Sequence, residues 1–82
     1  MEPTKRELIK LANVLEKFEN RALRDTGMKN INGGYAFAEM YNYDDDYFDV
    51  ELKLGIQNMC AGCSEEHAEL YKLNRQTWEF KN

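Results

Sequence analysis

The chain has 82 residues, of which 43% are hydrophobic and 12% aromatic, and its formal net charge at pH 7 is −4. This length allows a single domain, the composition argues against disorder, and the short apolar runs exclude a membrane-spanning segment. No apolar stretch follows the charges of residues 1–8, so no secretory signal is expected and the expected compartment is the cytoplasm, or the cytoplasm of a host.

Charge is unevenly distributed along the chain. Residues 1–30 carry seven Lys/Arg and five Asp/Glu, residues 31–56 carry one and six, and residues 57–82 carry three and four. The middle of the chain is therefore the acidic part, which bears on the choice of partner and on association rates more than on fold.

The first 25 residues have the strongest helix signal. Thr4 and Glu7 form a capping-box pattern. Apolar residues then recur at spacings of three and four: Leu8, Leu11, Leu15, Phe18 and Ala22. Gly27 is placed to end the helix in a left-handed conformation. The pattern predicts a helix over about residues 4–25.

Two strands are expected next. From Phe48 to Leu54, apolar residues alternate with Asp49, Glu51 and Lys53, which is the period-2 pattern of a strand with one buried face. Residues 35–43 alternate less regularly; they would suit a helix start, but their aromatic content favours a strand. The sequence therefore predicts a hairpin of strands at about 35–43 and 47–54, with the three aspartates between them as its loop.

After Gly55 a second helix is predicted, over about residues 57–75 or 64–75. Ser64 would cap it, with Glu65 and Glu66 in its first turn. The tail is expected to add a short last strand. The predicted fold is α+β, with a long helix, an antiparallel hairpin, a second helix and a short C-terminal strand in one domain over residues 1–82.

Cys60 and Cys63 form a C-x-x-C pair, and His67 follows four residues later. These three residues are candidate zinc ligands, although a structural site needs a fourth ligand, from a carboxylate, a water or a second subunit. The alternative is a buried helical stripe of Cys60, Cys63, His67 and Leu70, since free cysteine is among the most buried residue types. Apart from this zinc, no cofactor is expected.

The stretch 41–54, YNYDDDYFDVELKL, combines carboxylates with aromatic rings. Its spacing does not match a calcium loop, and a loop tip lacks the pocket that acid–base catalysis needs. Tyrosines beside charges are typical of protein-binding patches, whereas the alternative is that the rings are core and the aspartates keep an edge soluble. The candidate partner-binding residues are Tyr41, Tyr43, Asp44, Asp45, Asp46, Tyr47, Asp49 and Glu51.

The first helix also carries a basic stripe. Its members fall within about an 80° arc at 100° per residue: Arg6, Lys10, Lys17, Arg21 and Arg24. The stripe lacks interleaved aromatic residues and the whole chain is acidic, so direct nucleic-acid binding is disfavoured and a solvated helix face is the simpler interpretation. Pairing with the acidic hairpin of a second copy is the route to a homo-oligomer.

No nucleotide-binding or catalytic motif is present, so no enzymatic activity is expected. The sequence favours a protein-interaction module whose acidic hairpin occludes a basic surface on a larger protein, for example a nucleic-acid-binding enzyme. By analogy of class alone, such small acidic α+β proteins include phage inhibitors of host defence (anti-CRISPR and anti-restriction proteins) and immunity proteins. The alternative is a small zinc-stabilised binding module that uses Cys60, Cys63 and His67.

Overall fold

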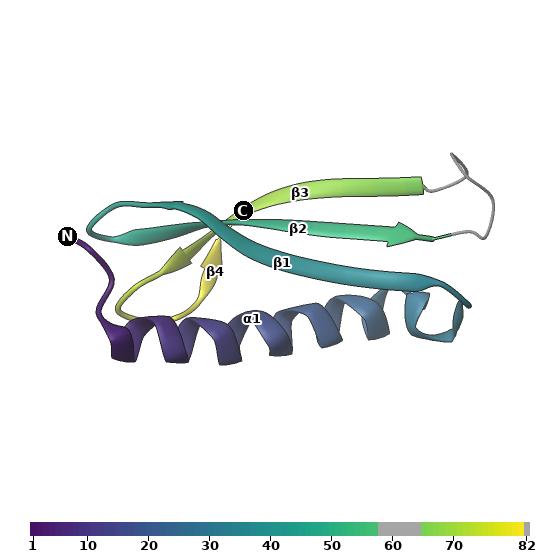
Figure 1. Ribbon diagram of the computed structural model, residues 1–82, viewed down its shortest axis with the longest axis horizontal. Helices are drawn as coiled ribbons and strands as arrows, with labels where there is room; N and C mark the ends of the chain where they lie inside the picture. Colours follow the sequence, from purple (N-terminus) through teal and green to yellow (C-terminus); the bar gives the residue numbers. More distant parts are fainter. Residues whose placement is uncertain (58–64, 82) are drawn as a thin grey trace.

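One long helix lies along one face of a four-stranded antiparallel sheet (Figure 1). The computed structural model describes residues 1–57 and 65–81. In chain order its elements are helix α1 (Lys5–Asp25), the short 3-10 helix η1 (Met28–Asn30), and strands β1 (Gly34–Tyr43), β2 (Tyr47–Ile56), β3 (Glu65–Asn74) and β4 (Phe80–Lys81). The α+β architecture expected from the sequence is confirmed.

Helix α1 begins and ends where the sequence predicts. The Thr4 side chain accepts a hydrogen bond from the Glu7 backbone N–H, and the Glu7 side chain accepts one from the Thr4 N–H, so the capping box is complete. Gly27 follows the helix in the left-handed region, with φ of 76°. Within the described ranges, no helix is both long and apolar enough to cross a membrane.

The sheet is a meander in the order β1-β2-β3-β4. The hairpin of β1 and β2 lies where the alternation predicts it, with a register shift between Met40 and Asn42. Strand β4 pairs only with the end of β3, at Leu73 and Lys72. Neighbouring strands in a sheet lie about 4.7–4.9 Å apart. Side chains on each strand of this sheet therefore lie close to the side chains of the next strand.

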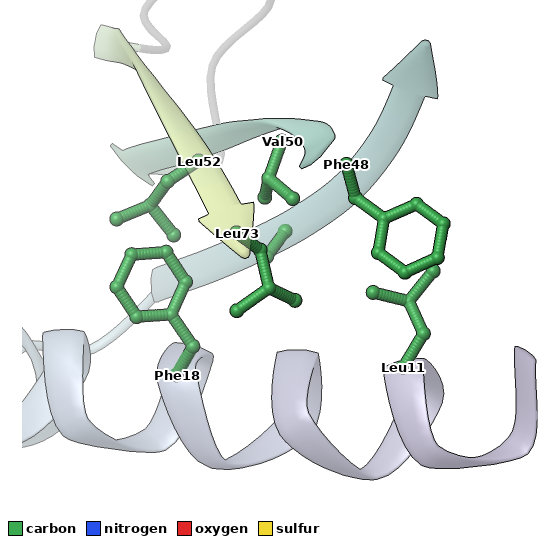
Figure 2. Packing of buried hydrophobic residues seen from close by; sticks show 7 residues of the cluster. Leu11, Phe18, Phe48, Val50, Leu52 and Leu73 are labelled. Carbon is green, nitrogen blue, oxygen red and sulfur yellow. The ribbon is translucent and has the colours of Figure 1, made fainter. Parts of the chain in front are cut away.

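The core fills the layer between α1 and the sheet. Leu11 and Phe18 project from the helix towards the sheet (Figure 2). The sheet's contribution to the buried cluster is Ala38, Phe48, Val50, Leu52 and Leu73. The Phe18 ring stacks on Phe80 with centroids 4.0 Å apart, which ties the last strand to the helix.

The predicted second helix is wrong over residues 65–74, which form strand β3. This strand pairs with β2 along its full length, from Ile56↔Glu65 to Tyr47↔Asn74. The segment is rich in good helix formers, but pairing with a central strand outweighs intrinsic propensity. Residues 58–64, and with them Ser64, lie outside the described residues.

Candidate protein-binding face

Helix α1 covers one face of the sheet, and no element in the described part of the chain covers the other (Figure 1). Strand alternation directs Phe37 of β1 and Leu70 of β3 to this open face, opposite the core residues. Phe37 is 50% exposed, Tyr41 54% and Leu70 61%. Tyr41 and Leu70 line one hollow on this face, and exposed apolar side chains that adjoin one another are typical of a surface that binds another molecule.

A pair of like charges lies in the middle of the open face. Glu39 of β1 is directly opposite Glu51 of β2, and Glu51 is in turn opposite Leu70. Glu51 has a partial partner in Lys53, with 3.6 Å between Oε1 and Nζ, while the Glu39 side chain makes no hydrogen bond or ion pair with a described residue. Like charges directly opposite each other destabilise a sheet, and Lys53 offsets this repulsion only in part.

At the hairpin tip, Asp44 shapes the turn. Its Oδ1 accepts hydrogen bonds from the backbone N–H groups of Asp46, at 2.8 Å, and Tyr47, at 2.7 Å. These two bonds hold the pKa of Asp44 below its usual value. The Asp44 carboxylate is therefore occupied within the hairpin, although it remains exposed.

Two other predicted carboxylates also have partners within the chain. Asp45 pairs with the N-terminal ammonium of Met1, which lowers the pKa of Asp45. Asp49 accepts a hydrogen bond from Lys72 Nζ at 2.8 Å. The side chain of Asp46 has no such contact with a described residue. Of the four aspartates in the predicted patch, Asp45 and Asp49 are thus paired with cations of the chain, whereas the charges of Asp44 and Asp46 have no such partner among the described residues.

The predicted tyrosines separate onto two sides. Tyr41 reaches the open face, where it lines a hollow of about 370 Å³ together with Asp49, Leu70 and Lys72. Tyr47 is half-buried near Lys72, whose Nζ lies 5.7 Å from its ring centre. Tyr43 pairs with Phe48 and so belongs to the helix side of the sheet.

Three residues of the open face are not among the partner-binding residues predicted from the sequence: Phe37, Glu39 and Leu70. The alternation of 35–43 contains the signal for the first two, but the register with β2 is needed to show that they meet Lys53 and Glu51. The sequence does not place Leu70 on this face because it predicts a helix, and not a strand, for residues 65–74.

Of the three predicted zinc ligands, the structure describes only His67. Cys60 and Cys63 lie outside the described residues, and the predicted helical stripe that links them to His67 and Leu70 is wrong, because His67 and Leu70 occupy opposite faces of strand β3. His67 Nε2 lies 3.2 Å from Glu69 Oε1. Residues 1–57 and 65–81 contain no group of three His, Cys, Asp or Glu side chains arranged to hold a metal.

Comparison of the chain with protein-family models, with curated proteins and with solved structures finds no match.

Proposed function

We propose that this chain is a non-enzymatic protein-interaction module that binds a basic surface of a larger protein and blocks access to it. The contact surface is the open sheet face, with Phe37, Tyr41 and Leu70 as apolar anchors and Glu39 and Glu51 as the charged centre. The hairpin tip, residues 44–46, forms one end of this surface.

The cross-strand pair of Glu39 and Glu51, in which Lys53 pairs with Glu51 but not with Glu39, is the observation that carries the proposal. A directly opposed pair of carboxylates weakens the sheet when the protein is alone. A lysine or arginine from a partner would remove that repulsion on binding, and the surrounding aromatic and aliphatic side chains would exclude water from the new ion pair. Repulsion between the two carboxylates destabilises the free protein, and its relief on binding would stabilise the complex.

Occlusion of a nucleic-acid site follows from the same chemistry. Proteins bind the phosphate backbone with lysine and arginine side chains, and an acidic sheet face presents carboxylates to the same cations. Such a module would act as a competitive inhibitor of the larger protein, with an association rate that falls as salt increases.

Site-specific photocrosslinking tests the proposal directly. Phe37 is replaced with a benzoylphenylalanine residue, and the protein is irradiated in a lysate of the cells in which it occurs. We expect one adduct with a protein of basic surface, formed less efficiently at high salt and suppressed when nucleic acid is added before irradiation.

The matched control places the same photoreactive residue at Ile9, which is 57% exposed on the outer side of α1. No adduct is expected there. An absence of adducts at Phe37, the same adduct at Ile9, or an adduct whose yield nucleic acid does not reduce would each contradict the proposed function.

The variant Glu39→Lys separates binding from stability. Lysine opposite Glu51 replaces a repulsive cross-strand pair with an attractive one, so we expect the free energy of unfolding to rise by about 0.5 kcal/mol. Affinity for the captured partner should fall at least tenfold, because the new cation repels a basic surface. Thermal unfolding and a binding titration measure the two effects, and a variant that binds as tightly as the original chain would refute the assignment of this face.

A further inference from the structure

A second surface lies on the other side of the molecule, between α1 and the segment that leads into β4. A groove of about 580 Å³ runs there. One wall carries Lys17, Arg21 and Arg24, whose spacings of four and three bring them onto one side of the helix. Glu79 is the one carboxylate among the described residues that line it.

These cations are not neutralised by neighbouring carboxylates. Lys17 and Arg21 form no ion pair with a residue in the described ranges, and Arg24 reaches only Asp25, at 3.9 Å with both side chains exposed. Three positive charges therefore face one negative charge, in a chain that is acidic as a whole. Clefts lined by one sign of charge attract ligands of the opposite sign even when the net charge of the protein opposes it.

Folding also brings aromatic side chains to the basic stripe. Trp78 and Phe80 line the same groove, and Lys10 Nζ lies 4.9 Å from the centre of the Trp78 ring. The basic stripe has no interleaved aromatic residues in the sequence, because Trp78 and Phe80 lie at the other end of the chain and meet the helix only in the fold. Both side chains are half-buried against the core, and their exposed parts supply the aromatic surface that the helix alone lacks.

Trp78 is held in an unusual backbone conformation. Its φ is 60°, in the left-handed region that bulky residues rarely occupy. The Trp78 N–H donates to the Asn74 carbonyl at 2.8 Å, so a tight turn fixes the ring beside the helix. Backbone strain of this kind concentrates at binding and catalytic sites.

We propose that this groove binds single-stranded nucleic acid, with phosphates against Lys17, Arg21 and Arg24 and a base against Trp78. Grooves that combine cations with aromatic rings bind single strands because unpaired bases expose their faces, whereas a duplex hides them. The basic stripe from Arg6 to Arg24 extends for about 27 Å at 1.5 Å per residue, which exceeds the length of one nucleotide and suits a strand.

Fluorescence of Trp78 provides a local readout, because it is the only tryptophan in the chain. An oligothymidylate of about ten nucleotides, within the usual site size of such grooves, is titrated at low salt. We expect quenching that saturates and an affinity that falls as salt increases, because each contact of a lysine or arginine with a phosphate releases condensed counterions from the strand.

Two double variants, each removing two positive charges, form the matched test. Lys17→Gln/Arg21→Gln removes cations from the groove, whereas Lys5→Gln/Lys29→Gln removes exposed cations elsewhere. For the groove variant the slope of log affinity against log salt should become shallower by about 1.4, at about 0.7 per lost phosphate contact. The control variant should keep the original slope.

Further titrations identify the occupant. A duplex of the same length and thymidine monophosphate should both bind more weakly than the single strand. The proposal is overturned if the single strand produces no quenching, if both double variants behave alike, or if polyglutamate binds as well as the oligonucleotide, which would assign the groove to acidic protein segments. None of these outcomes bears on the open sheet face, so this inference and the proposed function fail or stand separately.

Discussion

Replacing Arg75 with alanine is expected to lower the free energy of unfolding by about 3–5 kcal/mol, the range found when one partner of a buried ion pair is removed. The Arg75 side chain is only 4% exposed. Its guanidinium binds both carboxylate oxygens of Glu7, at 2.9 and 3.0 Å, and donates to the backbone carbonyls of Asp44 at 2.6 Å and Met1 at 3.0 Å. One side chain thus joins the start of α1, the hairpin tip and the turn after β3.

The loss should be visible in thermal unfolding. For a domain of this size each kcal/mol corresponds to a shift of about 4–8 °C in Tm, so Arg75→Ala should unfold at least 12 °C below the original protein. Arg24→Ala is the matched control, because its ion pair with Asp25 is exposed at 3.9 Å and should contribute less than about 1 kcal/mol. Equal Tm values for the two variants would show that Arg75 does not hold these elements together.

The pH dependence of stability provides an independent check on the same pair. Arg75, and then the Thr4 backbone N–H, hold the pKa of Glu7 below its ordinary value of 4.5. A carboxyl with a depressed folded-state pKa stabilises the fold above its unfolded pKa, and this stability is lost as pH falls below about 4.5 and through the folded pKa. In Glu7→Gln that part of the acid sensitivity should disappear, so the stability of the variant should depend less on pH in this range.

Arg75 could not have been identified from the sequence. Nothing in the stretch LNRQTW distinguishes it from a surface arginine. The groups that its side chain binds belong to Glu7, Met1 and Asp44, which are 68, 74 and 31 positions away in the sequence. The sequence signals that succeeded are local: the capping box of Thr4, and the strict alternation of β2. Both depend on neighbours within a few residues.

Strand β3 shows the opposite case. Most of its residues, EEHAELYKLN, are good helix formers read alone, and the long ladder with β2 makes them extended. The same non-local pairing decides which side of the sheet Leu70 occupies, and folding of the C-terminal turn decides that Trp78 meets the basic stripe. Both candidate surfaces therefore consist of residues whose chemistry is evident in the sequence and whose proximity is not.

Two phenylalanines on opposite faces of the hairpin should respond very differently to replacement by alanine. Phe48 is fully buried, and its ring lies 5.8 Å from that of Trp78 and 4.8 Å from the Arg75 guanidinium. Phe48→Ala should therefore cost about 3–5 kcal/mol, a large part of the 5–15 kcal/mol typical of whole domains. Chemical denaturation, with Trp78 fluorescence as the signal, measures the loss.

Phe37→Ala removes the same atoms from the open face and should change stability by about 1 kcal/mol or less, because half of that side chain is already in water. Its effect should instead be on the partner captured by photocrosslinking, with at least a tenfold loss of affinity, as expected for an aromatic anchor. If Phe37→Ala destabilised the chain as strongly as Phe48→Ala, the ring would belong to the core and the sheet would have no free face to offer. A stable Phe37→Ala protein that no longer binds would mean that the sheet carries its apolar side chains on two faces for two purposes, one for folding and one for recognition.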